Sequence, residues 1–132
     1  MLIPGRLDLK AWRNQILRTP FVLTDADTGA AINYAGTYLG AQVRLYGKAP
    51  GDPLVSLSPT DTAQANGLFR TDEAGGAFDL VIIPSTLVAM PANSGQPWQV
   101  MRFAWDLRFQ PIGGDMMTLL EGDFFLYSGV TQ

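Results

Sequence analysis

Three carboxylates toward the C-terminal end come closest to a catalytic arrangement. Glu121 and Asp123 lie two positions apart, so on a strand both side chains point to the same face. Asp106 lies in the preceding apolar–polar segment, which we expect to pair beside them. A glycosidase needs two carboxyl groups about 5–9 Å apart across a cleft. Because Arg102 and Arg108 share the same predicted face, the three acids are better explained as a charge-balanced sheet surface than as a catalytic pair.

Other catalytic chemistries lack their residues. The chain has neither histidine nor cysteine, which removes the commonest general base, the commonest zinc ligand and any thiol or disulfide. Gly75-Gly76 and Gly113-Gly114 do not precede helices, so they predict hairpin turns and not phosphate-binding loops. Asp25 and Asp27 form an Asp-x-Asp turn without the glutamate that an EF-hand spacing requires. We therefore expect no enzyme, no metal and no cofactor.

Aromatic residues outside the core-facing positions are the second candidate for function. Exposed Trp and Tyr can stack on sugars or anchor a protein interface, and packing against a second sheet explains about half of them equally well. A carbohydrate-binding module would use Trp12, Trp98 or Tyr46 as its platforms. Tyr34 and Tyr38 are also expected to point outward. The candidate interface residues, which include two apolar residues near the start, are Leu2, Ile3, Trp12, Pro20, Tyr46, Trp98, Phe125 and Tyr127.

The clearest structural signal is the alternation of apolar and mostly polar residues along Met101–Phe109, which is typical of a strand with one buried face. A turn at Pro111–Asp115 and a second strand at Met116–Tyr127 complete a hairpin. A shift of one residue would put Glu121 on the core side, so burial selects a single register. The predicted cross-strand pairs are Leu107 with Leu120, Trp105 with Gly122, Phe103 with Phe124, and Met101 with Leu126.

This register gives Gly122 a steric role, since the Trp105 indole can lie over a position without a side chain. On the outer face it predicts two diagonal ion pairs, Arg108–Glu121 and Arg102–Asp123, each of small energy.

The remaining elements are short and separated by glycine and proline. Pro20 lacks an amide donor, so its strand is predicted to be an edge that could accept a neighbouring strand. About eight strands with almost no helix predict an all-β fold, an antiparallel two-layer β-sandwich of the immunoglobulin-like type. The other strands are expected at Leu7–Leu9, Ile16–Thr24, Tyr38–Tyr46 (with Leu39, Ala41, Val43 and Leu45 inward), Leu54–Leu57, Gly67–Thr71 and Ala77–Ile83, with a loop at Ser58–Asn66 and one helical turn at Pro84–Met90.

Composition favours an assembly protein. At 132 residues the chain is expected to form one domain (1–132), with an apolar N-terminal arm at Met1–Gly5 that reaches onto an adjacent subunit or another protein of the assembly. Charged residues make up only 16%, against about 25% in typical soluble domains, which suits a surface partly covered by partners. A low-charge monomer is the alternative. The nine basic residues are scattered, so nucleic-acid binding is not expected, and no apolar run approaches the length of a membrane helix. The start has no secretion-signal pattern.

A family resemblance rests on short motifs spread along the chain. They are Trp105-Asp106-Leu107, Gly113-Gly114, Leu119-Leu120-Glu121-Gly122, Gly129-Val130-Thr131, Asp25–Ala30, Ala41–Arg44 and Gly76–Pro84. Taken in their order along the chain, these motifs resemble those of small virion proteins of tailed bacteriophages, such as the N-terminal domain of baseplate upper proteins and tail-fibre adaptors.

The resemblance implies a structural protein of the virion, assembled as an oligomer in the bacterial cytoplasm and placed in a tail, baseplate or neck-like complex. Its implied partners are other virion proteins and further copies of itself, and the exposed aromatics add a host-surface glycan as a further candidate. The alternative function is a small carbohydrate-binding module, and an enzyme ranks third.

Overall fold

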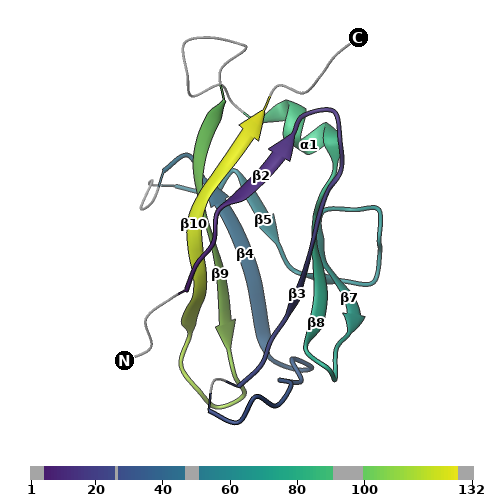
Figure 1. Cartoon of the computed structure of the whole chain (residues 1–132), viewed down its shortest axis with the longest axis vertical. Coiled ribbons are helices and arrows are strands. Elements are labelled where there is room, and N and C mark those ends of the chain that lie inside the picture. Colours follow the sequence, from purple (N-terminus) through teal and green to yellow (C-terminus); the bar gives the residue numbers. More distant parts are fainter. Residues whose placement is uncertain (1–4, 26, 47–50, 91–99, 128–132) are drawn as a thin grey trace.

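The structure is a computed structural model that describes residues 5–25, 27–46, 51–90 and 100–127. Within these residues ten strands form two sheets packed face to face, and there is one short helix (Figure 1). The predicted all-β sandwich is therefore confirmed, with more strands than expected. In chain order the elements are β1 (Gly5–Arg6), β2 (Leu9–Trp12), β3 (Leu17–Val22), β4 (Tyr38–Arg44), β5 (Val55–Leu57), β6 (Pro59–Thr60), β7 (Gly67–Asp72), β8 (Ala77–Ile82), α1 (Pro84–Ala89), β9 (Met101–Gln110) and β10 (Met117–Tyr127).

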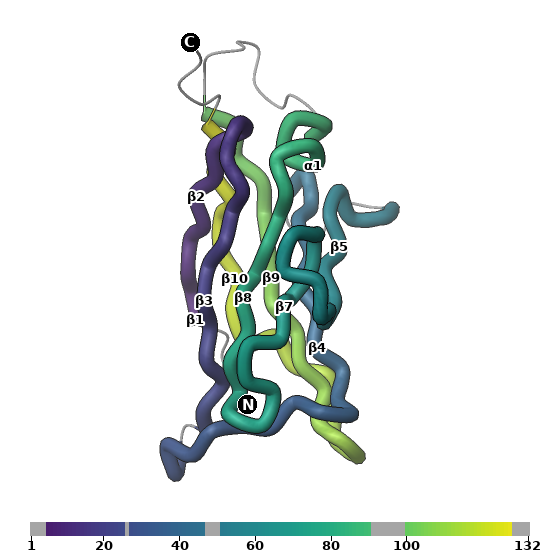
Figure 2. The backbone as a smooth tube through the Cα atoms, turned by 90° about the vertical axis from the view of Figure 1, so that its right-hand side faces the viewer, coloured from purple at the N-terminus to yellow at the C-terminus, as the bar shows by residue number. Residues whose placement is uncertain are grey.

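The order of strands defines the type of sandwich. Sheet A has the order β1-β10-β9-β4-β5, with β2 also paired to β10, and sheet B has the order β3-β8-β7-β6. Figure 2 shows β3, β8 and β7 of sheet B in front of the strands of sheet A. In the letters used for immunoglobulin domains, β10, β9, β4 and β5 are G, F, C and C′, and β3, β8 and β7 are B, E and D. This topology confirms the immunoglobulin-like type.

The C-terminal hairpin has the predicted register. Leu120 lies opposite Leu107, Gly122 opposite Trp105, Phe124 opposite Phe103 and Leu126 opposite Met101. The register shifts between Thr118 and Leu120, which makes one residue of β10 a bulge near the turn. The inner residues of β9 are all buried, so its alternation supplies one wall of the core.

An aromatic contact joins the two sheets near the middle of the core. The Phe21 ring of β3 lies 5.5 Å from the Phe78 ring of β8 and 6.3 Å from the Trp105 ring of β9. In antibody domains the strands equivalent to β3 and β9 are joined by a disulfide. This chain has no cysteine, and here aromatic rings make the contact between those two strands instead.

The N-terminal segment differs from its prediction. Of the strand expected at Leu7–Leu9 only Leu9 lies in a strand, because Leu7 and Asp8 separate β1 from β2. Both short strands pair in parallel with β10, so the sandwich is not wholly antiparallel. Gly5, the last residue of the expected arm, pairs with Leu120 of its own domain, whereas residues 1–4 lie outside the described residues.

Smaller corrections follow from strand ends. The loop expected at Ser58–Asn66 contains β6, which pairs in parallel with β7. Leu45, expected to face inward, is 39% exposed because β4 ends one residue earlier. The predicted helical turn is α1, and among its last carbonyls Leu87 O accepts the Met90 amide at 3.3 Å. The Arg13 guanidinium donates to two of these end carbonyls, Leu87 O at 2.9 Å and Val88 O at 3.0 Å. No helix among the described residues is long and apolar enough to span a bilayer.

Candidate functional site

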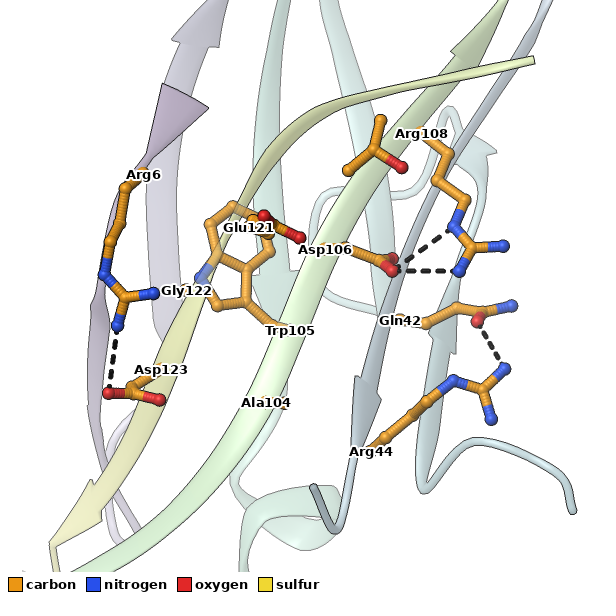
Figure 3. Close-up of a pocket in the computed structure, with 11 residues that line it drawn as sticks. Arg6, Gln42, Arg44, Ala104, Trp105, Asp106, Arg108, Glu121, Gly122 and Asp123 are labelled. Carbon is orange, nitrogen blue, oxygen red and sulfur yellow. Dashed lines mark hydrogen bonds and ion pairs between the residues drawn. The ribbon is translucent and has the colours of Figure 1, made fainter. Parts of the chain in front are cut away.

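The outer face of sheet A contains a groove of about 540 Å³. Its walls come from β1 and β10 on one side and from β9 and β4 on the other (Figure 3). The small side chain of Ala104 lies between long polar side chains, which is why the face is hollow there. The lining residues are Arg6, Gln42, Arg44, Ala104, Trp105, Asp106, Arg108, Thr118, Glu121, Gly122 and Asp123.

Gly122 is required by the backbone of the N-terminal segment and not only by the indole. A Cβ atom at this position would overlap the Leu7 carbonyl oxygen and lie 2.8 Å from the carbonyl carbon. The same oxygen accepts a hydrogen bond of 2.7 Å from Trp105 Nε1. The Trp105 side chain thus reaches across β10 to hold Leu7, and the predicted reason for Gly122 is corrected accordingly.

The Asp8 side chain replaces the Leu7 carbonyl as a hydrogen-bond acceptor for β10, because that carbonyl is bonded to Trp105. In a regular parallel ladder the Leu7 carbonyl would accept the amide of Asp123. Here Asp8 Oδ1 accepts that amide at 2.9 Å, while the Leu7 amide donates to Glu121 O at 3.1 Å. Arg6 lies 3.3 Å from Asp8 Oδ1 and 3.1 Å from Asp123 Oδ2, so a small charged cluster forms at this wall of the groove.

The ion pairs on the outer face differ from those predicted. Arg108 Nη2 lies 3.1 Å from Asp106 Oδ2 on its own strand, in place of the expected pair with Glu121. Asp123 pairs with Arg6, which the hairpin alone could not reveal. Arg44 donates to Gln42 Oε1 at 2.8 Å and to the Gly51 carbonyl at 3.0 Å.

Two carboxylates face each other across the hairpin. Asp106 lies directly opposite Glu121, a like-charge arrangement that destabilises a strand pair. Asp106 Oδ1 is buried and has no hydrogen-bond partner, which costs about 1–3 kcal/mol. Glu121 is exposed and forms no ion pair with any described residue. Glu121 can therefore accept hydrogen bonds from a donor that enters the groove, whereas the buried Asp106 Oδ1 cannot be reached from it.

Aromatic residues extend the outer face beyond the groove toward the end of β10. The rings of Trp12 and Tyr127 stack with centroids 5.1 Å apart, and Phe125 is half-buried beside them. Of the other predicted interface residues, Tyr46 is 55% exposed just after β4, and Pro20 lies on β3 at the edge of sheet B. The predictions at Leu2, Ile3 and Trp98 lie outside the described residues.

Apolar residues also occupy the opposite end of this face. Tyr38 and Met116 are exposed on either side of Gln110, and the Tyr38 ring lies over Gly40 with its Cζ 2.9 Å from where a Cβ would be. Ile112 at the hairpin turn is 78% exposed. Neither Met116 nor Ile112 was predicted as exposed. Alternation along the strand would place Met116 inward with Leu120 and Gly122, and the bulge between Thr118 and Leu120 reverses this.

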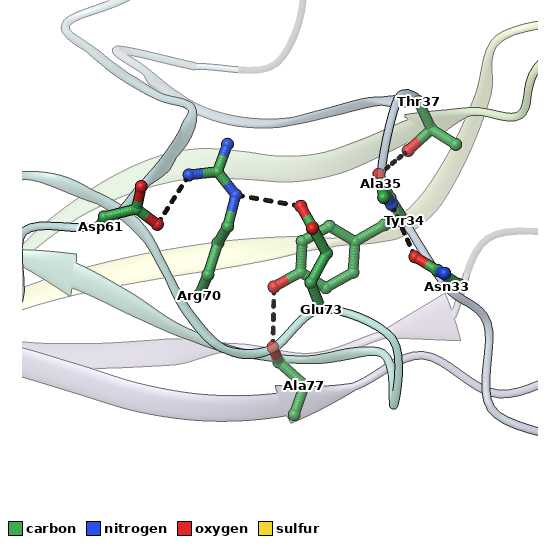
Figure 4. Close-up of polar contacts among 8 residues, drawn as sticks. All are labelled: Asn33, Tyr34, Ala35, Thr37, Asp61, Arg70, Glu73 and Ala77. Atoms are coloured by element: carbon green, nitrogen blue, oxygen red, sulfur yellow. Dashed lines mark hydrogen bonds and ion pairs between the residues drawn. The ribbon is translucent and has the colours of Figure 1, made fainter.

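Tyr34 was expected to point outward and is instead buried. Its hydroxyl donates to the Ala77 carbonyl at 2.8 Å (Figure 4). Its ring packs edge-on against Phe78. Burial raises the pKa of the Tyr34 hydroxyl, and the Glu73 carboxylate raises it further. The single tyrosine in a polar loop gave no periodic pattern that could have revealed this contact.

The neighbouring polar network is structural. Arg70 donates to Asp61 Oδ1 at 2.9 Å and to Glu73 Oε2 at 3.1 Å, which joins β7 to the turns on both sides. The Asp61 hydrogen bond, followed by the charges of Asp61 and Glu73, raises the pKa of Arg70 above its ordinary value. In the Asp-x-Asp turn, Asp25 Oδ1 accepts the amides of Asp27 and Thr28, so it caps its own turn.

No model of a known protein family matches the chain, and no curated protein matches it.

Proposed function

We propose that this chain is a non-catalytic structural protein of a tailed-bacteriophage virion. In this proposal it docks onto neighbouring proteins in a tail, baseplate or neck-like complex, assembled in the bacterial cytoplasm. Two observations support it, the sequence resemblance and the surface of sheet A. The second carries the proposal because it involves specific side chains.

The outer face of sheet A has the composition of a protein interface. Trp, Tyr, Phe, Met and Arg are the residue types enriched at such interfaces. Trp12, Phe125 and Tyr127 lie at one end of the face, Tyr38 and Met116 lie at the other, and the groove with its arginines lies between them. One continuous surface therefore offers aromatic anchors around a polar centre.

Docking by this face is favoured over strand addition at the sheet edges. The edge strand β3 contains Pro20, which has no amide to donate, and β5 is only three residues long. The other edge of sheet A is interrupted at Leu7 and Asp8, between β1 and β2. Edges of this kind resist pairing with another chain.

The interior also supports a non-catalytic role. No polar or charged residue is buried in the described part of the chain. The acids of the groove lie on the outer face of sheet A beside arginines, as in a charge-balanced sheet surface.

Purified particles test the proposal directly. Virions are assembled in cells where the tested chain is the only version of this protein. Mass spectrometry of the purified virions should detect the wild-type chain. Met116→Glu should lower incorporation about tenfold, because it places a charge at an apolar end of the proposed interface. Val22→Glu, at a 62% exposed position on sheet B, is the matched control and should leave incorporation unchanged. Absence of the wild-type chain from particles would refute the function, and equal incorporation of both variants would refute the choice of face.

A further inference from the structure

Strand β10 has an open side at its start. Among the described residues β1 reaches only as far as Leu120, so residues 117–119 have no strand beside them on the side away from β9. Backbone groups on such an open edge can pair with a further extended segment. The start of β10 therefore has room for a continuation of β1.

The core is incompletely covered at the same place. Leu120 and Met117 lie opposite two inward-facing residues of β9, so they point inward as well. Their partners, Leu107 and Phe109, are 0% and 4% exposed, whereas Leu120 and Met117 are only half-buried. The nearest residue of β1 is Gly5, which has no side chain to cover them, and a Cβ there would lie 3.0 Å from Leu120 Cδ2. An apolar side chain beyond Gly5 would complete the core here.

The hydrogen bonds of the N-terminal segment determine how the preceding residues would meet β10. The Leu7 amide donates to Glu121 O, and in a parallel ladder every second residue directs its backbone groups to the partner strand. If the register continues, Ile3 directs its backbone to β10 and Pro4 directs its backbone away. Proline has no amide to donate, so this register loses no hydrogen bond at Pro4.

The alternation of side chains places an apolar residue on the inner face. Arg6 lines the groove on the outer face, so with a period of two Pro4 and Leu2 face outward and Ile3 faces inward. Ile3 is β-branched and precedes a proline, and both features favour an extended backbone. Four extended residues span about 13 Å, which is long enough to run beside the open stretch of β10.

We propose that residues 1–4 continue β1 along the start of β10 in the same chain, with the Ile3 side chain packed over Leu120 and Met117. The same chain is favoured over a second copy, because Gly5 is fixed beside Leu120 and holds the segment next to its site. The segment is then an edge of the sandwich. This assignment differs from the arm onto an adjacent subunit that the sequence predicts, and it does not depend on the proposed function.

Two neighbouring apolar residues provide a matched test in the whole chain. Ile3→Ser and Leu2→Ser make similar changes on opposite faces of the proposed strand. We expect Ile3→Ser to raise the unfolding equilibrium constant about tenfold in urea denaturation, because it removes apolar surface from the core. Leu2→Ser should change this constant by no more than about twofold, as is usual for an exposed position. Equal effects of the two variants, or a larger effect of Leu2→Ser, would overturn the proposal.

Nuclear magnetic resonance of the wild-type chain measures the contact itself. We expect nuclear Overhauser effects between the methyl groups of Ile3 and Leu120, and slow hydrogen exchange at the Ile3 amide. A mixture of two differently labelled samples separates effects within one molecule from effects between molecules. Effects seen only between molecules would assign the segment to a second copy and overturn the proposal, and so would the absence of any effect.

Discussion

Strand β10 has a different kind of neighbour on each side. On one side β9 precedes it in the chain and pairs in antiparallel fashion through a tight hairpin. On the other side β1 and β2 pair in parallel and come from the opposite end of the sequence. The hairpin is specified by alternation and turn length, which are local. The parallel pairing depends on individual side-chain contacts between residues more than a hundred positions apart, such as Asp8 and Asp123.

The largest expected effect comes from adding a side chain at Gly122 of β10, where the Leu7 backbone lies close. Gly122→Val would place atoms where the Leu7 carbonyl lies, so the N-terminal segment must move away from β10. We expect a loss of about 3 kcal/mol in the free energy of unfolding, measured by urea denaturation. Ala104→Val creates the same isopropyl side chain on the outer face, where a Cβ is already present, and should cost far less. An unchanged stability of Gly122→Val would contradict the close approach of Leu7.

Trp105→Phe separates the roles of the indole. The variant keeps an aromatic ring in the core but leaves the Leu7 carbonyl without its donor. We expect a loss of about 2 kcal/mol, from the unsatisfied acceptor and the smaller ring. Trp12→Phe is the matched control, because Trp12 is 39% exposed and the ring can still stack on Tyr127. Equal losses in the two variants would show that the bond to Leu7 contributes nothing.

Variants of Asp8 test whether its side chain holds the Asp123 amide in place of a backbone carbonyl. Asp8→Ala removes the acceptor of the Asp123 amide and should cost about 1 kcal/mol. Asp8→Asn keeps an oxygen in place and should recover most of this loss, apart from the weak exposed contact with Arg6. Hydrogen exchange at the Asp123 amide provides the local measurement. If exchange there is equally fast in both variants, the amide is not held by Asp8.

Tyr34 provides the smallest effect and extends the comparison to sheet B. Like Trp105, it ties a loop segment to a distant carbonyl, here that of Ala77. Because its pKa is raised in the folded state, its contribution to stability is complete below its ordinary pKa of 10.0 and is lost as the pH rises through the folded value. Arg70 stays charged in this range, since its pKa is also raised.

The measurement is the difference in stability between wild type and Tyr34→Phe from pH 8 to 11. We expect the wild type to lose stability relative to the variant only in the alkaline part of this range. A constant difference would mean that the hydroxyl titrates alike in the folded and unfolded chain.

The two faces of sheet A show how far the sequence alone could lead. Along β9 every inward position was predictable, since burial requires a strict period of two and a single slip would bury Glu121. The outward positions were also predictable as a set. Their partners were not, because Arg6, which pairs with Asp123, lies in a segment whose pairing no local pattern reveals.

The groove was unpredictable for the same reason. Its walls combine β1, β10, β9 and β4, and only the β9–β10 part is determined locally. Gly122 was noticed for its missing side chain, but its reason depends on where Leu7 lies. Tyr34 was misplaced because an isolated aromatic residue in a polar loop carries no periodic signal of burial.

Parallel pairing of the first strands with the last one has a mechanical consequence. Gly5 lies beside Leu120 and Trp12 beside Tyr127, so the outer ends of β1 and β10 point to opposite poles of the sandwich (Figure 1). Tension applied between these poles slides β1 and β2 along β10 and loads their hydrogen bonds all together, in shear. An antiparallel pair pulled from its open end would instead unzip one bond at a time. The hydrogen bonds from Trp105 to Leu7 and from the Asp123 amide to Asp8 also join the N-terminal segment to the β9–β10 hairpin, so they resist this sliding. A domain built in this way is suited to transmit force along its long axis.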